Sequence, residues 1–340
     1  MKRIAVITAV IFFLVLQAHA GRASAADDNG GDRPPLVGLE KVESIVYGAP
    51  GSGGLLLRLS KIERDLFGME LPGSLTERQT ALENFVEKEN SGQPSLLFKA
   101  AVAEWVTLRR VNTSLPFAER VDELERTLEG EPQTGPLSAR LERIISKLMP
   151  NGVTSEAVTV PASTVIKSKF VNTLTVRNVK KDDVVALEVV EDCVSGGMLV
   201  AARGNRLFAC VTKVKLPRSF GRPSEIGVEF QDIEFLDGTT THVFIGPESK
   251  KAMELDSATI GAAGASVAGA VLLGPVGLAG GFLVRGSDKQ IKEGTQVFVE
   301  TAEAYGVKGY RIPALELPNV IDTDVPSSPS GGESGVDVAE

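Results

Sequence analysis

The sequence predicts an α+β protein. We expect an N-terminal all-α domain of helical-hairpin repeats, followed by an antiparallel β-barrel or sandwich domain with an inserted glycine-zipper helical hairpin. Apolar residues recur at threes and fours as far as Leu148, which is typical of packed helices. Beyond Thr154 they alternate with a period of two, which is typical of half-buried strands. An uncharged run rich in Gly, Ala and Ser, at 257–284, interrupts the strands.

The first 25 residues have the pattern of a secretory signal peptide. Lys2 and Arg3 precede an apolar stretch at 4–16, and small-x-small cleavage sites end at Ala20 and Ala25. The apolar stretch is short for a membrane span, so we expect cleavage and release. The exported chain then begins with a polar linker at 26–35.

Charge and length limit the classes of function. Removal of the signal peptide takes away three basic residues and no acidic one, so the net charge changes from −8 to −11. That balance disfavours nucleic acid as a partner, because nucleic-acid binding needs a basic surface. About 315 residues are too many for one typical core and predict two domains.

The predicted helical domain covers 36–152 and contains an internal repeat. The copies, at 38–68 and 120–150, are offset by 82 residues, and each reads as two helices joined by a Gly/Pro turn. Two further helices lie between the copies, the first with a capping box from Ser74 to Glu77. Trp105 falls on an apolar stripe and is expected in the core.

The predicted β domain covers 155–312. Its opening motif, Val160 to Ile166, is echoed at 292–297, so we expect the first and last strands to close a barrel. A change of phase near Gln231 and Asp232 predicts a β-bulge, and Asp237-Gly238 predicts a hairpin turn. The acidic Pro/Ser/Gly segment 313–340 is predicted to be a disordered tail.

The uncharged run is the candidate functional segment. Small residues every fourth place would let a second helix approach closely, and Gly274-Pro275 would turn the chain, so a hairpin is predicted over 257–286. The candidate residues for self-association or membrane contact are Gly261, Ala265, Gly269, Gly274, Gly277 and Gly281. An ordinary buried hairpin or a flexible loop is an equally open interpretation.

Few other residues suggest chemistry. Cys193 and Cys210, the two cysteines, could form a disulfide after export, or stay free. His242 is the one histidine left after cleavage, and no nucleophile motif accompanies it. The sequence therefore predicts no catalytic residues, no metal site and no cofactor.

Several strand and turn motifs resemble a known family. They are Val160-Pro161-Ala162-Ser163-Thr164, the strand 184–190, the small-residue turn 201–205, Phe220-Gly221-Arg222 and Phe235-Leu236-Asp237-Gly238-Thr239. Over about 158–305 the chain resembles the β-barrel domain of the TrbI-type scaffold of type IV secretion and conjugation complexes. That resemblance implies a two-helix antenna at 257–284 that contributes to an outer-membrane pore. The chain departs from that family in its cleaved signal, in the absence of a proline-rich spacer and in the glycine-zipper character of the antenna. It is similar also to bacterial cell-envelope glycine-zipper proteins, and its repeats resemble helical hairpins of uncharacterised exported proteins.

Two functions follow as expectations. The first is a non-enzymatic structural or scaffold protein of the periplasm or outer membrane, which self-associates and touches a membrane or envelope proteins through the hairpin. The second is a soluble periplasmic binding module with the hairpin buried in the fold.

Overall fold

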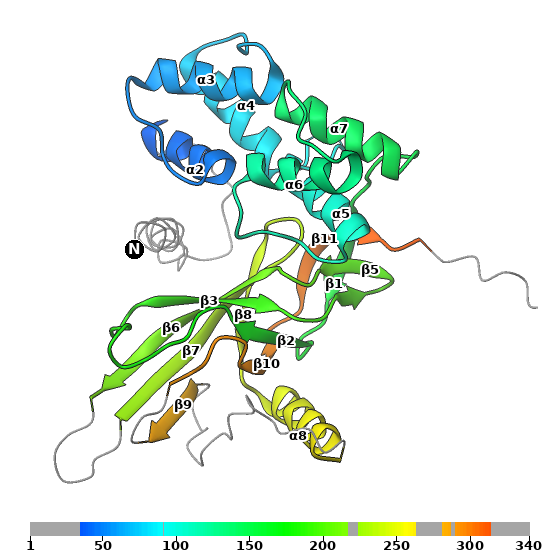
Figure 1. Cartoon of the computed structure of the whole chain (residues 1–340). Coiled ribbons are helices and arrows are strands. Elements are labelled where there is room, and N and C mark those ends of the chain that lie inside the picture. Colours follow the sequence, from blue (N-terminus) through cyan, green and yellow to red (C-terminus); the bar gives the residue numbers. More distant parts are fainter. Residues whose placement is uncertain (1–34, 91, 217–223, 263–280, 287–289, 314–340) are drawn as a thin grey trace, which may run out of the picture.

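The computed structural model describes residues 35–90, 92–216, 224–262, 281–286 and 290–313. It confirms the α+β class: a helical region comes first, and antiparallel strands that include a closed barrel follow it. In Figure 1 the helices α2 to α7 form one end of the molecule, and the strands form the other.

Among the described residues, six helices precede the strands, as the periodicity predicted. They are α2 (Pro35–Tyr47), α3 (Leu55–Phe67), α4 (Leu75–Glu87), α5 (Leu96–Leu108), α6 (Phe117–Glu129) and α7 (Leu137–Leu148). Successive helices begin 20 or 21 residues apart, and each is 12 or 13 residues long. The repeating unit is therefore a single helix with its turn, and the predicted 82-residue repeat spans four such units.

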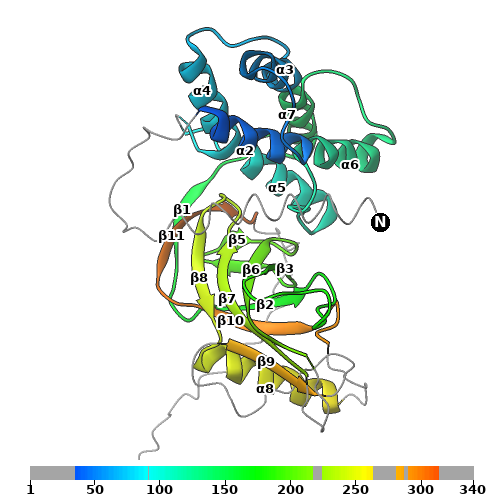
Figure 2. The same cartoon turned by 90° about the vertical axis from the view of Figure 1, so that its left-hand side faces the viewer.

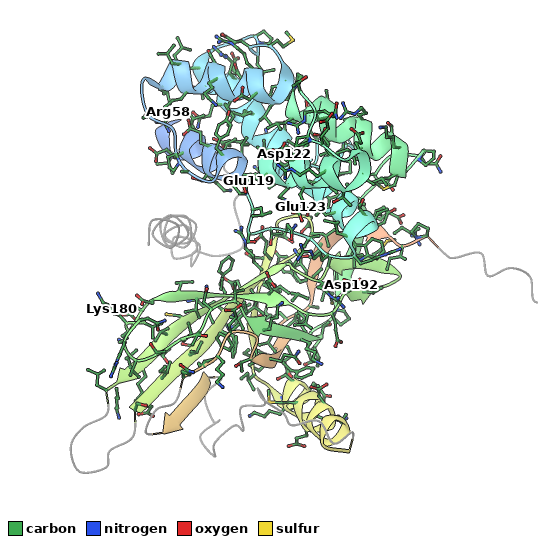
Figure 3. The ribbon with its side chains drawn as sticks, in the orientation of Figure 1. Arg58, Glu119, Asp122, Glu123, Lys180 and Asp192 are labelled. Carbon is green, nitrogen blue, oxygen red and sulfur yellow. The ribbon has the colours of Figure 1, made fainter. Side chains whose placement is uncertain are left out.

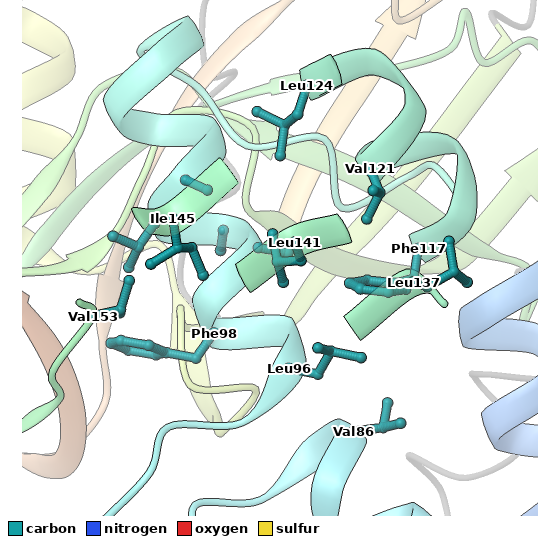
Figure 4. Packing of buried hydrophobic residues seen from close by; sticks show 14 of the residues in the cluster. Val86, Leu96, Phe98, Phe117, Val121, Leu124, Leu137, Leu141, Ile145 and Val153 are labelled. Carbon is teal, nitrogen blue, oxygen red and sulfur yellow. The ribbon is translucent and has the colours of Figure 1, made fainter. Parts of the chain in front are cut away.

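The helix ends follow local chemistry that is readable in the sequence. Ser74 and Glu77 form the predicted capping box at the start of α4. Gly68 and Gly130 end α3 and α6 in the left-handed conformation, which glycine adopts without a steric penalty. The apolar faces meet in one core, which includes Phe98, Phe117 and Leu141 (Figure 4).

Four buried glutamate–arginine pairs join consecutive helices. The pairs are Glu43 with Arg58, Glu63 with Arg78, Glu104 with Arg120, and Glu125 with Arg140. Each glutamate also accepts a hydrogen bond from the backbone N–H eight residues later, in the turn between the two helices, at Gly51, Leu71, Asn112 and Gln133. We call each such set a Glu–Arg clamp. It satisfies a buried carboxylate and fixes the turn at the same time.

The clamps divide the helices into two groups of three. Helices α3 and α6 each take part in two clamps, because each carries the arginine of one clamp five residues before the glutamate of the next. In α5 the residue five before Glu104 is Lys99, which pairs instead with Glu142 of α7. Consecutive clamps therefore link α2 to α4 and α5 to α7, and no clamp joins α4 to α5. The first and last helices lack the residue for a further clamp. In α2, Gly38 stands five residues before Glu43, where α3 and α6 have arginine, and in α7, Ile145 stands five residues after Arg140, where they have glutamate.

The strands form two antiparallel sheets. They are β1 (Glu156–Val160), β2 (Val165–Phe170), β3 (Val184–Val189), β4 (Cys193–Ser195), β5 (Met198–Ala201), β6 (Arg206–Lys215), β7 (Ser224–Glu234), β8 (Thr240–Phe244), β9 (Gly281–Gly286), β10 (Gln296–Thr301) and β11 (Tyr305–Arg311). The larger sheet has the order β6-β3-β2-β10-β8-β7-β9, and pairing of β6 with β7 closes its first six strands into a barrel. The smaller sheet has the order β1-β11-β5-β4.

Three features of the barrel agree with the sequence. Strands β2 and β10, which follow the two similar motifs, pair directly with each other. In the pairing of β6 with β7, the register gains a residue between Phe230 and Ile233, which is the predicted bulge. Asp237-Gly238 turns the chain from β7 into β8, with Gly238 at a φ of +80°.

The helical region and the strands share part of one core. Trp105 is 6% exposed, and its indole N–H donates to the Asp192 carboxylate at 2.7 Å. Figure 3 labels Asp192 among the strands next to the helical region. Its ring meets Tyr310 of β11 edge to face, with 6.1 Å between the ring centroids. Leu199, Ala202 and Leu236 also belong to the helical core cluster. The two regions are therefore packed against each other through buried side chains.

One predicted boundary is wrong. The hairpin was expected to be helical as far as residue 286, but Gly281–Gly286 is strand β9, which pairs along Ser224 to Glu229 of β7. The helical interpretation relied on small residues in the run. Phe282, Leu283 and Val284 favour a strand, and the first half of β7 extends past β8 and offers an unpaired edge.

Removal of one partner from a Glu–Arg clamp should destabilise the protein strongly. Glu104→Leu leaves Arg120, which is 4% exposed, charged and without its carboxylate. We expect the free energy of unfolding to fall by about 3–5 kcal/mol, measured by urea unfolding with circular dichroism. The double change Glu104→Leu with Arg120→Met removes both charges and should recover much of that loss.

An exposed ion pair provides the control for this experiment. Arg110 is 3.5 Å from Glu123, with its side chain 53% exposed. Arg110→Ala should therefore change stability by less than about 1 kcal/mol. Equal effects of Glu104→Leu and Arg110→Ala would contradict a structural role for the clamps.

Candidate functional site

The structure describes only the two ends of the predicted functional segment. Gly261 lies near the end of helix α8 (Pro247–Ala262), and Gly281 begins β9. Ala265, Gly269, Gly274 and Gly277 lie outside the described residues. The candidate site is therefore the base of this insertion, formed by α8 and β9 where they join the barrel.

Both elements lie at the end of the barrel that faces away from helices α2 to α7. Figures 1 and 2 show α8 and β9 together at that end from two directions. α8 contacts β2 and β10, and β9 extends the sheet at β7. The two ends of the uncharged run are thus fastened to the same part of the molecule.

A buried carboxylate holds the start of α8. Glu300 of β10 is 1% exposed, and its Oε2 accepts a hydrogen bond from the backbone N–H of Ser249 at 2.6 Å. A negative charge at a helix N-terminus is favourable, because the first N–H groups of a helix lack partners within the helix. The hydroxyl of Ser249 accepts from the N–H of Gly246 at 2.9 Å. A Cβ at 246 would lie 2.0 Å from Glu300 Oε1, so any larger residue there would displace the Glu300 carboxylate.

An ion pair holds the middle of α8. Lys167 of β2 donates to Asp256 at 3.0 Å and lies 3.3 Å from Glu191. Burial lowers the pKa of Lys167, but the hydrogen bonds to Asp256 and Glu191 outweigh burial and raise its pKa above the usual value. Its ammonium also lies 5.2 Å from the centre of the Phe298 ring. α8 is therefore fixed at its first turn and again about two turns later.

Thr301, next to Glu300, joins the barrel to its opening motif. Its hydroxyl donates to the carbonyl of Pro161 at 2.8 Å and accepts from the N–H of Thr164 at 3.0 Å. Its backbone carbonyl accepts from Ser163, which has a φ of +59°. Two adjacent residues of β10, Glu300 and Thr301, therefore hold both the start of α8 and the turn before β2.

The two cysteines are free thiols in this structure, so the possible disulfide is not formed. Cys193 lies in β4, which pairs with β5, whereas Cys210 lies in β6 between β3 and β7. The two strands belong to different sheets, and the sequence alone could not show that. Burial raises the pKa of Cys193 to about 11, and burial with nearby Asp182 raises the pKa of Cys210.

His242 lies on the exposed face of β8. Its Nδ1 is 3.7 Å from Asp232 Oδ1 on β7, and interaction with that carboxylate raises the pKa of the imidazole. Among the described residues, no group of three His, Cys, Asp or Glu side chains is placed to hold a metal ion. In the same part of the chain, no helix is long and apolar enough to cross a membrane.

Sequence reasoning missed the residues that anchor the insertion. Glu300 lies 51 residues from Ser249, Lys167 lies 89 residues from Asp256, and nothing nearby in the sequence marks either residue. The Glu–Arg clamps left a readable signal, since glutamate and arginine recur at a separation of 15 or 16 residues across each turn.

Loss of the Glu300 charge should loosen α8 alone. Glu300→Gln keeps the size of the side chain but weakens a hydrogen bond of the charge-assisted kind, which contributes about 1.5–3 kcal/mol. Amide hydrogens in 247–256 should exchange at least about tenfold faster by mass spectrometry. Exchange in helices α2 to α7 should not change. Glu248→Gln, which removes an exposed acid from the same helical turn, should have little effect. Equal exchange in the two variants would contradict the anchoring role of Glu300.

The thiols should react slowly at neutral pH. The thiolate is the reactive form, and a pKa of about 11 leaves about one Cys193 thiol in a few thousand ionised at pH 7.5. Alkylation of the folded protein should therefore be slow and should accelerate about tenfold per unit between pH 7 and 9. Unfolding without a reductant should expose both cysteines, and mass spectrometry should show two added groups. If the unfolded protein gained no alkyl group until a reductant was added, the two cysteines would be joined by a disulfide.

Comparison with known proteins does not identify a family. No protein-family model matches the chain, and no curated protein matches it. Among solved structures, ComB10 of the Com type IV secretion system of Helicobacter pylori is matched with 11% identity. The match covers 43% of this chain and 88% of that chain, at a TM-score of 0.23.

Proposed function

We propose that the protein is a non-enzymatic scaffold of the bacterial cell envelope that self-associates and touches a membrane through the uncharged insertion. The observation that carries the proposal is the anchoring of α8 and β9 at one end of the barrel. Such a base supports a segment that leaves the fold and returns to it. A flexible surface loop would need no buried carboxylate and no paired strand at its ends.

The composition of the insertion supports contact between copies. Residues 257–284 carry no charge, and Gly261, Ala265 and Gly269 recur at every fourth position. On a helix this spacing forms a smooth face that a second helix can approach closely. The partners proposed are therefore further copies of this chain, with membrane lipid or envelope proteins at the surface that the insertion reaches.

The signal peptide supports export to the periplasm or outer membrane. The remaining interpretation is a soluble periplasmic binding module that buries the insertion. These two functions differ in whether the run is accessible, and accessibility is what the following experiment measures.

Substitution of the small residues should separate self-association from simple insertion. In the full mature chain, Gly261→Leu, Ala265→Leu and Gly269→Leu together raise hydrophobicity but fill the smooth face. We expect oligomers, measured by chemical crosslinking, to decrease at least about tenfold, while binding to anionic and neutral lipid vesicles by flotation is kept or increased. The matched control is Ala258→Leu with Val267→Leu and Val271→Leu, which leaves that spacing intact and should decrease oligomers less.

Two results would overturn the proposal. One is a wild-type chain that stays monomeric with vesicles and whose run resists proteolysis, which would favour the buried binding module. The other is an equal decrease of oligomers in both triple variants, which would show that the spacing of small residues does not matter.

A further inference from the structure

We propose that two copies of this chain also pair edge to edge through β9, in an antiparallel strand contact around a two-fold axis. This contact rests on the proposed function in one respect, since it assumes self-association. It differs in its chemistry, because backbone hydrogen bonds of β9 form it rather than helix packing within the uncharged run.

β9 is the outermost strand of the larger sheet. Its six residues pair with Ser224 to Glu229 of β7, and in the strand order β9 stands last, after β7. Within the part of the chain that the structure describes, no strand pairs with its other edge. An edge strand presents a row of backbone N–H and C=O groups that another strand can extend.

Among the described residues, the other sheet edges are protected in ways that β9 does not share. In the smaller sheet, edge strand β4 has only three residues, and Ser195 at its end donates to the carbonyl of Thr159 in β1, the opposite edge. β1 also carries Glu156, paired with Arg311. β9 is twice as long as β4, has no proline and carries a single charge, Arg285. Long edges without proline or several charges are the ones that associate.

The sequence of β9 is compatible with pairing to itself. In an antiparallel pair with two-fold symmetry, the residue on the axis faces its own copy. A pairing of five of the six residues puts either Leu283 or Val284 on the axis, and both are apolar. Arg285 then faces Gly281 or Leu283 of the second copy, never another Arg285. No like charges therefore oppose each other, which makes a second copy a suitable occupant of this edge.

This geometry limits what β9 can build. A two-fold contact uses the free edge of β9 in each of the two copies and leaves no β9 edge for a third copy. β9 alone therefore gives dimers. A larger assembly requires another interface, which the small residues of the uncharged run would supply. The two contacts would therefore alternate in an assembly larger than a dimer.

Single cysteines at the proposed axis test the contact. In the full mature chain with Cys193→Ser and Cys210→Ser, we would introduce Leu283→Cys or Val284→Cys separately and oxidise mildly. One of the two should form a disulfide-linked dimer at least about tenfold faster than the other, because only the residue on the axis faces its own copy. Leu255→Cys, on a helix position that is 62% exposed, measures random collision. Circular dichroism checks that each variant is folded.

The outcomes separate the two proposals. Crosslinking of Leu283→Cys and Val284→Cys at the same rate as Leu255→Cys would overturn the β9 contact, whatever the triple leucine variant does. Selective crosslinking that persists in the variant with Gly261→Leu, Ala265→Leu and Gly269→Leu would establish the β9 contact separately from the run. If oligomers were unchanged in that variant, the proposed role of the small residues would fail while the β9 contact stands.

Discussion

The contacts of Glu300 and Thr301 are the constraint on which the β region and its insertion depend. Strand β10 pairs with β8 through these two residues, so they complete the barrel wall. Thr301 bonds the turn before β2, and Glu300 caps the start of α8. The pairing of β8 with β10 and the placement of the insertion consequently depend on the same two residues, Glu300 and Thr301. A carboxylate can be buried here at acceptable cost because the N–H of Ser249, at the positive start of a helix, donates a hydrogen bond to it.

The helical region solves a different problem with a related device. Short helices of 12 or 13 residues have little stability alone, so their turns and packing must fix them. Each Glu–Arg clamp links a helix to its successor and to the turn between them, which sets their relative position. A buried ion pair contributes little net stability compared with apolar residues. The loss of one partner, however, leaves an uncompensated buried charge. The clamp thus favours one arrangement of the helices over alternatives.

These two devices place the candidate site at the end of the barrel farthest from the helices. Trp105 and Tyr310 pack the regions together, so the helical region is not an independent appendage. α8 and β9 join the barrel at the opposite end (Figure 2). The proposed function requires that the insertion between them be available to a second copy or to a membrane. The proposed contacts at the run and at β9 would lie next to each other in sequence but would use side-chain packing in one case and backbone pairing in the other.

Local patterns determined which elements form and of what kind. Six helices, the capping box at Ser74, the bulge between Phe230 and Ile233 and the turn at Asp237-Gly238 all depend on neighbouring residues, and all were predictable. The pairing of β2 with β10 was accessible through a repeated motif. Tertiary structure alone decided the role of Glu300 and Lys167, the separation of Cys193 from Cys210, and the strand at Gly281–Gly286. Each of these depends on which segment lies alongside another, and a contact between residues distant in sequence leaves no period or spacing in a single chain to reveal it.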